Sequence, residues 1–288
     1  MHTKRLVTED STLAYATGGV EGGPPLVLVH GWSGSRAHFD GLLPRLTTCH
    51  HVIAIDLPGH GNESRSERRS WTVEAFAQDV AAVLDAEHIE SAVLAGHSMG
   101  AAVVLETARL APHRVRHVVA LDSLTYLQFY PRATKEETAA VTGPFRSDFP
   151  AAVDHLVESF SSEDTDPGFR RMLTRDLRAV EPGTAVDILD EVMFWDLDSA
   201  LAATDAPVTV LAVEKLLAPE AIEHYGHRMD VVPVGLGGHW FLMESPDATA
   251  ILLQGIAGAG TTAGGMPEGP VRRTAAGHLG IEDRKLLA

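Results

Sequence analysis

The sequence predicts an α/β protein with a mostly parallel sheet covered by helices. Two observations lead to this fold class: short apolar runs recur along the chain, and segments of helical period separate them. The runs are rich in Val, Ile and Leu with few polar interruptions, as strands buried on both faces of a parallel sheet must be. They are PLVLVHG (25–31), HVIAIDLPG (51–59), SAVLAGHS (91–98), RHVVALDS (116–123), PVTVLAV (207–213) and DVVPVG (230–235).

Two segments between these runs have the pattern of helices, and the first residues have the pattern of a hairpin. Residues 71–88 place Val73, Phe76 and Val80 on one stripe, which predicts an amphipathic helix. A second helix is expected over 99–111, directly after Ser98. The opening residues, KRLVTEDSTLAYATGG, read as a hairpin that leads into the sheet.

Two stretches interrupt the alternation and set the expected domain organisation. Residues 124–196 contain no apolar strand run but many aromatic residues and amphipathic acidic segments, and about 70 residues is too long for a bare loop. We therefore expect a helical cap at 124–196, inserted into a core formed by 1–123 and 197–254. Residues 255–288 begin glycine-rich and without period, which predicts a flexible tail.

Composition limits the class of protein. The 288 residues are 45% hydrophobic and 22% charged, so the chain can bury a full core. Lys+Arg 23 against Asp+Glu 39 gives a net charge of −16, which argues against nucleic acid as a partner. The single cysteine, Cys49, suits a reducing compartment. The chain shows no secretory leader and no apolar run long enough for a membrane span, so we expect a cytoplasmic protein without a membrane partner.

The strongest chemical signal is GHSMG at 96–100, which fits the pattern G-x-S-x-G. This turn exposes a serine between a strand and a helix, and its glycines are needed where the backbone is strained and crowded. So short a motif also occurs by chance in unrelated sequences. Here it ends an apolar run and opens a helical segment, which is the position that a nucleophilic serine in this turn requires. Ser98 is therefore the candidate nucleophile; the alternative is an ordinary glycine turn.

The helix expected after Ser98 also predicts half of an oxyanion hole. The first N–H groups of a helix are unpaired and favour negative charge, so the Met99 N–H can stabilise an oxyanion. A second donor should come from the loop after an earlier strand. LVHGWSGS (28–35) fits, because Gly31 lets the backbone turn inward and present the Trp32 N–H.

These motifs, in this order, resemble the α/β-hydrolase superfamily. The resemblance covers residues 5–254 and is carried by PLVLVHGW, DLPGHG (56–61), GHSMG, FWDLDSALAATDAPVTVLAV (194–213) and GGHWFLMESPDA (237–248). It implies an eight-stranded, mostly parallel sheet with a helical cap inserted after the sixth strand, at the insertion already expected from the pattern.

The resemblance also implies a triad in the chain order Ser, acid, His. His239 follows the last strand run, and two glycines before it free its loop to aim the ring at Ser98, so His239 is the expected general base. His97 and His60 are better explained by packing. The acid departs from the usual pattern, because Leu216 stands where the Asp after the seventh strand would fall. Asp122, directly after the sixth strand, is the preferred acid and Glu214 the alternative.

No metal or cofactor is expected. The acidic run at 158–168 lacks the ligand spacing and the closing Glu of a calcium loop. His224 and His227 lie three residues apart without a partnering His or Cys pattern, so a zinc site is not indicated. The chain carries neither a P-loop nor a G-x-G-x-x-G after a strand.

The first function hypothesis is a serine hydrolase of a small carboxylic ester or lactone, and two alternatives stay open. Cofactor-independent 2,4-dioxygenases, which open heteroaromatic rings, are similar in having the acid after the sixth strand and an L-G-G phrase before the histidine. They carry a substrate-binding histidine where this chain has Gly34. The other alternative is a non-catalytic, ligand-binding member of the superfamily. Cap helices often form dimer contacts in this superfamily, so a homodimer is also an expectation.

Overall fold

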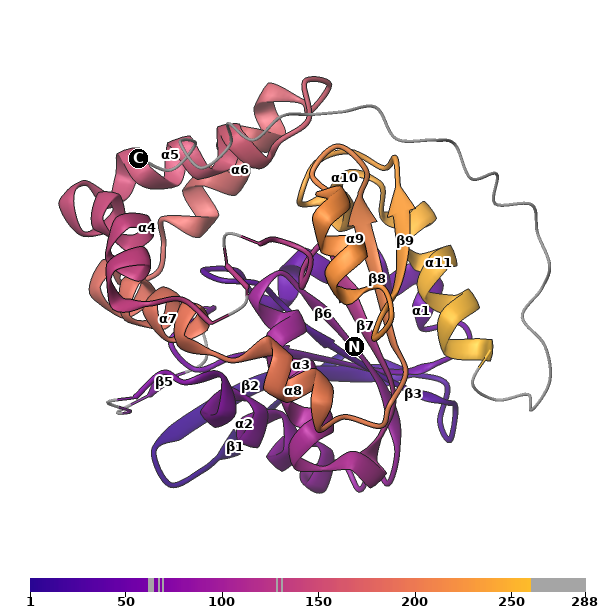
Figure 1. Cartoon of the computed structure of the whole chain (residues 1–288). Coiled ribbons are helices and arrows are strands. Elements are labelled where there is room, and N and C mark those ends of the chain that lie inside the picture. The colour runs from indigo at the N-terminus through magenta and orange to yellow at the C-terminus, as the bar shows by residue number, and fades with distance from the viewer. Residues whose placement is uncertain (62–64, 67, 69, 128, 131, 260–288) are drawn as a thin grey trace.

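The computed structural model describes residues 1–61, 65–66, 68, 70–127, 129–130 and 132–259. A twisted sheet crosses the centre of the molecule, with helices on both of its faces (Figure 1). The strands are β1 (His2–Val7), β2 (Ser11–Gly19), β3 (Pro25–Val29), β4 (His51–Asp56), β5 (Arg65–Ser66), β6 (Ala92–His97), β7 (Val115–Leu121), β8 (Val208–Val213) and β9 (Asp230–Val234).

The strand order is β1-β2-β4-β3-β6-β7-β8-β9, and the two-residue β5 pairs with β2 outside this path. β1 and β2 form the predicted antiparallel hairpin, and β2 is also antiparallel to β4. From β4 to β9 every pair along the path is parallel. The predicted eight-stranded, mostly parallel sheet is confirmed, with β5 as a short addition.

The strands are apolar on both sides because both faces of the sheet are covered. Alternate side chains of a strand point to opposite faces. Leu26 and Leu28 of β3 accordingly pack in the cluster that contains Phe39 and Leu253, while Val27 and Val29 pack in the cluster that contains the apolar stripes of α2 and α3. All residues of β6 and β8 are buried.

Helices fill the connections between the strands. They are η1 (Arg36–Phe39), α1 (Leu43–Leu46), α2 (Val73–Ala86), α3 (Met99–Leu110), η2 (Pro112–Arg114), α4 (Lys135–Ser147), α5 (Phe149–Phe160), α6 (Pro167–Leu177), α7 (Pro182–Phe194), α8 (Leu197–Ala202), α9 (Pro219–Tyr225), α10 (Phe241–Glu244) and α11 (Pro246–Ala259). The helices predicted at 71–88 and 99–111 are α2 and α3.

The segment between β7 and α8 folds into the four helices α4 to α7, which lie together beyond the end of the sheet (Figure 1). Their starts follow local signals. A proline stands in the first turn of α5, α6 and α7, and the acidic residues Asp148, Asp166 and Glu181 accept backbone N–H groups at these three helix starts. These four helices are called the cap below.

The C-terminal end differs from the sequence-based expectation. The tail was expected from Gly255, but α11 continues to Ala259. Leu253 and Ala257 are buried in the cluster beneath α11. Tertiary packing therefore outweighs the helix-breaking composition of this stretch. The remainder of the predicted tail, residues 260–288, lies outside the described residues.

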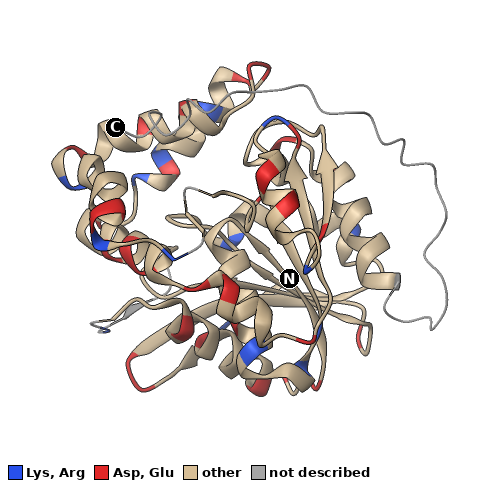
Figure 2. Cartoon of the chain, in the orientation of Figure 1, with Lys and Arg blue, Asp and Glu red and all other residues tan. Residues whose placement is uncertain are grey.

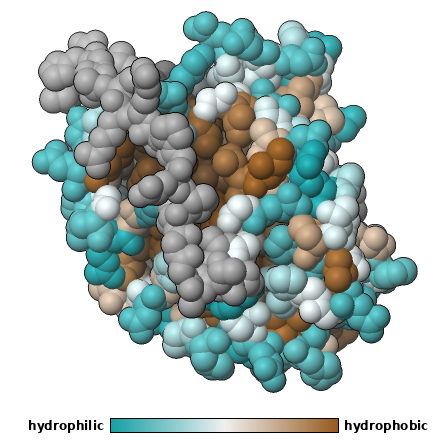
Figure 3. Space-filling model, turned by 90° about the vertical axis from the view of Figure 1, so that its right-hand side faces the viewer, coloured by the Kyte–Doolittle hydropathy of each residue, from teal (hydrophilic) through white to brown (hydrophobic). Residues whose placement is uncertain are grey.

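Charged and hydrophobic side chains are distributed differently over the surface. Charges of both signs are interspersed over the outer helices, with red acidic residues prominent (Figure 2). On the face shown in Figure 3, hydrophobic side chains gather in a hollow that hydrophilic ones surround. Within the part of the chain that the structure describes, no helix has both the length and the apolar character that a membrane crossing requires.

Candidate active site

Ser98 lies in the tight turn between β6 and α3. Its backbone has φ 52 and ψ −122, a conformation that is strained for a residue with a side chain. The Ser98 N–H donates to the Leu121 carbonyl at 3.1 Å, which ties the turn to β7. The hydroxyl does not cap α3, and Ser98 lines a cavity. The strained turn therefore places the serine at the cavity, with a hydroxyl that is not hydrogen-bonded to the start of α3.

The two glycines of the motif are required by backbone contacts. A Cβ on Gly96 would lie 2.1 Å from the Gly100 carbonyl oxygen, and a Cβ on Gly100 would lie 2.3 Å from the Val29 carbonyl oxygen. Backbone atoms in a packed sheet cannot give way by such distances. Only glycine at both positions lets α3 start directly on top of β3 and β6.

His239 and Asp122 form a buried pair beside this turn. The distance from His239 Nδ1 to Asp122 Oδ2 is 2.7 Å, and the two residues are 8% and 1% exposed. Because a carboxylate only accepts, Nδ1 carries the proton and Nε2 is left as the basic nitrogen. His239 and Ser98 line the same cavity. The two residues predicted as base and acid are therefore brought together.

The end of β7 holds the Asp122 carboxylate in place. The Asp122 N–H donates to the Leu211 carbonyl at 2.8 Å, which continues the ladder between β7 and β8. Its Oδ1 accepts the Val213 N–H at 2.7 Å, and its Oδ2 faces His239. Asp122 has φ 48, so the chain turns sharply there on its way to the cap.

Glu214, the alternative acid, lies in a different environment. It follows β8 and is exposed, and its backbone N–H donates to the Val234 carbonyl at 3.1 Å. It is not among the residues that line the cavity with His239. The structure brings Asp122, and not Glu214, to the histidine.

The two predicted oxyanion donors come from adjacent backbone segments. A Cβ on Gly31 would lie 2.9 Å from Ser98 Cβ, so the loop after β3 passes directly against the serine turn. Trp32 and Met99 both line the cavity. The Trp32 indole N–H donates to the Ala185 carbonyl of α7 at 2.6 Å, so the side chain of the loop is fixed by the cap. The Trp32 backbone remains beside the serine.

The cavity is small and mostly apolar. It measures about 80 Å³ and lies between the serine turn and the cap. The cap contributes an apolar wall from Phe145, Leu156, Phe160, Leu177, Leu189 and Val192. Such a lining, with a few polar groups gathered at one side, is typical of a site for a small molecule.

Three further histidines near the site have structural roles. The pKa of His30 and His60 is lowered to about 3, chiefly by burial, so both are neutral. His30 Nε2 accepts the Leu57 N–H at 3.0 Å. His97 donates from Nε2 to the His239 carbonyl at 2.9 Å, and burial together with His239 holds its pKa well below the usual value. His97 therefore supports the histidine loop from below.

Three polar residues at the site carried no recognisable signal in the sequence: Tyr126, His38 and Glu244. The Tyr126 hydroxyl donates to Asp122 Oδ2 and lies 3.4 Å from His239 Nδ1. His38 of η1 lines the cavity, and burial lowers its pKa to about 4. Their positions depend on how distant segments pack, so no local pattern identifies them.

Glu244 of α10 joins the histidine loop to the cap. It accepts the Gly238 N–H at 2.9 Å and the Thr165 hydroxyl at 2.8 Å. Next to it, the His239 N–H donates to the Phe160 carbonyl at 2.8 Å. A Cβ on Gly238 would lie 2.6 Å from that carbonyl oxygen, so glycine is needed where the two segments meet. The cap therefore helps to hold the loop that carries His239.

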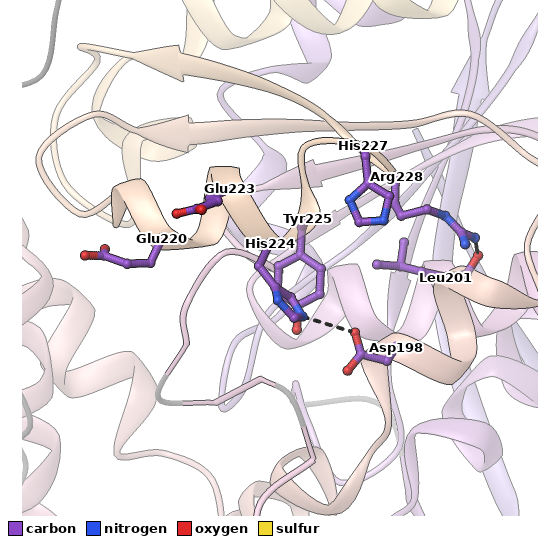
Figure 4. A pocket seen from close by; sticks show the side chains of 8 residues that line it. All are labelled: Asp198, Leu201, Glu220, Glu223, His224, Tyr225, His227 and Arg228. Atoms are coloured by element: carbon purple, nitrogen blue, oxygen red, sulfur yellow. Dashed lines mark hydrogen bonds and ion pairs between the residues drawn. The ribbon is translucent and has the colours of Figure 1, made fainter.

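A second, wider depression lies elsewhere, between α8 and α9. It measures about 590 Å³ and shares no lining residue with the serine cavity. Figure 4 shows His224 turned toward Asp198, and their side chains are 3.7 Å apart. Over the described ranges, no group of three or more His, Cys, Asp or Glu side chains is arranged to hold a metal ion. This depression has no evident link to the serine chemistry.

Three relatives with similar sequences carry the names of enzymes. A pimeloyl-[acyl-carrier protein] methyl ester esterase of Neisseria meningitidis (serogroup C) is 31% identical over 208 residues, which are 70% of this chain and 79% of that one. Esterase YbfF of Escherichia coli is 35% identical over 124 residues, 43% of this chain and 48% of the relative. The acetyltransferase component of an acetoin-cleaving system of Pseudomonas putida is 47% identical over 97 residues, but these cover only 26% of its length.

Solved structures and a family model agree on the fold. A thermophilic esterase from Thermogutta terrifontis superimposes with a TM-score of 0.77 at 22% identity, covering 91% of this chain and all (100%) of that one. Est816, described as an N-acyl homoserine lactone degrading enzyme, gives 0.76 at 23%, covering 88% and 99%. At these identities the likeness shows the fold alone. The model of the alpha/beta hydrolase fold matches residues 24–226, and the chain therefore belongs to the α/β-hydrolase fold family.

Proposed function

We propose that the protein is a serine hydrolase that cleaves a small carboxylic ester or lactone through an acyl-enzyme. Ser98 is the nucleophile, His239 the general base and Asp122 the acid. The observation that carries the proposal is the 2.7 Å contact between His239 Nδ1 and Asp122 Oδ2 beside a strained serine on the same cavity. A serine needs an oriented base to react at neutral pH, and this pair supplies one.

The proposed reaction has two stages, acylation of Ser98 and hydrolysis of the acyl-enzyme. Ser98 Oγ attacks the carbonyl carbon while His239 Nε2 takes the hydroxyl proton, and Asp122 stabilises the imidazolium that forms. The Trp32 and Met99 N–H groups stabilise the oxyanion. His239 then returns the proton to the leaving alkoxide. A water molecule, deprotonated in turn by His239, attacks the acyl-enzyme. The bond to Ser98 Oγ breaks, the carboxylic acid leaves, and His239 returns the proton to Ser98 Oγ.

The lining of the cavity and the relatives support the substrate class. Among the described residues that line the cavity, those of the cap are apolar and none is cationic, so an uncharged acyl group of modest size fits it best. Relatives named as esterases, 31% and 35% identical, support cleavage of a carboxylic ester. A lactone is an internal ester and presents the same carbonyl chemistry to Ser98.

The direct test is the intact mass of the protein after incubation with a fluorophosphonate probe. We expect one adduct on the wild type and none on Ser98→Ala, because the probe reacts with an activated serine. A panel of short-chain and aromatic esters and of lactones then defines the acyl group, with a burst of alcohol release as the sign of an acyl-enzyme. A wild-type protein that forms no adduct and cleaves none of the panel would contradict the proposal, and oxygen uptake with hydroxyquinolones would be measured next.

A further inference from the structure

Tyr126 stands in the segment that leaves β7 for the cap, four residues after Asp122. It is 7% exposed and lines the cavity. Its hydroxyl donates to Asp122 Oδ2, the same oxygen that accepts His239 Nδ1–H, and lies 3.4 Å from that nitrogen. The three polar atoms therefore form a closed cluster away from bulk water.

The hydrogen-bond donors in this cluster can be assigned. Nδ1 of His239 and the Tyr126 hydroxyl each have one hydrogen, and Asp122 has none when ionised. Both hydrogens therefore point at Oδ2, while Oδ1 accepts the Val213 N–H at 2.7 Å. Burial and the negative charge of Asp122 raise the pKa of the Tyr126 hydroxyl well above its usual value, so it is a donor at neutral pH.

Aromatic contacts hold the tyrosine ring in this position. Phe160 of α5 meets it edge-on at a centroid distance of 5.7 Å, and Phe129 does so at 6.5 Å. The His239 ring lies at 5.9 Å, also edge-on. The hydroxyl is fixed by packing on the cap side, so its hydrogen bond to Asp122 costs little further ordering.

We propose that Tyr126 is a positioning residue that shares the Asp122 carboxylate with His239 and thereby sets how strongly that carboxylate holds the protonated histidine. The inference rests on the proposed function. The hydrogen bond from Tyr126 draws negative charge from Oδ2, the oxygen that faces His239. Asp122 therefore stabilises the imidazolium less than it would without the tyrosine. Removing the tyrosine hydroxyl should therefore strengthen the hold of Asp122 on the imidazolium.

Other ionisable groups around His239 do not supply the same effect. Among the described residues, the ionisable neighbours of the His239 ring are Asp122, Tyr126 and His97. The His97 ring, on β6, has its centroid 4.6 Å from that of His239. His97 is neutral, because burial and His239 lower its pKa. Glu244 on α10 binds the Gly238 N–H and the Thr165 hydroxyl rather than the imidazole. Tyr126 is the group that contacts the carboxylate and the histidine together.

The test is the pH dependence of fluorophosphonate labelling and of ester hydrolysis in Tyr126→Phe, which removes one oxygen atom. We expect the acidic limb of kcat/KM, and of the labelling rate, to move to higher pH by about one unit. Tyr15→Phe is the matched control, because it also removes a tyrosine hydroxyl that donates to a carboxylate, that of Glu87, at 2.6 Å. Neither Tyr15 nor Glu87 is among the residues that line the cavity. This control should lose stability while its acidic limb stays in place.

A double variant separates action through Asp122 from a general loosening of the site. In an Asp122→Asn background the carboxylate is gone, so adding Tyr126→Phe should leave the acidic limb where the single Asn variant has it. An unmoved limb in Tyr126→Phe, or an equal shift in Tyr15→Phe, would overturn the role of Tyr126 and leave the proposed function standing. A wild type whose Ser98 does not label would instead remove the proposed function, and this inference with it.

Discussion

The His239 N–H donates to the Phe160 carbonyl at 2.8 Å, so the loop that carries the candidate base is hydrogen-bonded to the last residue of α5. The loop that carries the candidate oxyanion donor has a corresponding link, from the Trp32 indole to Ala185 of α7 at 2.6 Å. The cap therefore does more than cover the cavity. It shares hydrogen bonds with both loops, whose geometry the proposed reaction requires to be fixed.

Glu244→Gln tests this link between the cap and the histidine loop. The Glu244 carboxylate accepts hydrogen bonds from both the Gly238 N–H and the Thr165 hydroxyl. A glutamine keeps one acceptor oxygen but places an NH₂ group, itself a donor, near one of these two donors. We expect kcat to fall about tenfold, because the His239 loop loses its orientation. Glu158→Gln is the control and should keep full activity, because Glu158 lies exposed on α5 and pairs with Arg170. Equal activities in the two variants would show that the cap link does not matter.

Gly100→Ala should be among the most damaging small substitutions in the chain. Its Cβ would meet backbone oxygen atoms of Val29 and His30 at 2.3 and 2.6 Å, so α3 must move off the sheet. We expect the free energy of unfolding to drop by about 3 kcal/mol or more, measured by urea denaturation. The control is Gly255→Ala in α11, where a Cβ meets nothing within 4 Å. That change should stabilise the fold by about 0.5–1 kcal/mol, and no gain there would argue against helix at 255.

The buried histidines predict that stability falls in mild acid. The folded-state pKa is about 3 for His30 and His60 and about 4 for His38, in each case lowered mainly by burial. Below pH 6.5 the unfolded chain binds protons that the folded chain does not, so stability is lost as the pH falls from about 6.5 toward these values. Each histidine accounts for about 1.5 kcal/mol between pH 6.5 and 5.

Urea midpoints at a series of pH values measure this loss. His60→Gln should flatten the dependence by the contribution of one proton, whereas replacing the exposed His227 by Gln should not change it. A wild-type midpoint that is constant from pH 7 to 5 would contradict the expected loss.

The sequence patterns identify the residues whose position is fixed by the strand directly before them. Ser98 and Asp122 each follow directly after an apolar run, so recognising the strands was enough to put them at one edge of the sheet. Tyr126 and Glu244 could not be found in this way, because their contacts depend on how the cap docks against the loops. The predicted start of the tail, at residue 255, precedes the end of α11 for a related reason. Leu253 and Ala257 are buried against other parts of the chain, and composition does not reveal such contacts. Packing between distant segments is the part that local patterns miss.

The identity of the acid is the central point, and one comparison tests it most directly: the rate at which a fluorophosphonate inactivates Asp122→Asn and Glu214→Gln, both measured beside the wild type. Asp122 contacts His239 at 2.7 Å, whereas Glu214 is exposed and outside the cavity. We expect Asp122→Asn to slow inactivation by roughly a thousandfold or more, because the histidine loses its tautomer and its counter-charge, and Glu214→Gln to react like the wild type. A slow Glu214→Gln beside an unaffected Asp122→Asn would contradict the account.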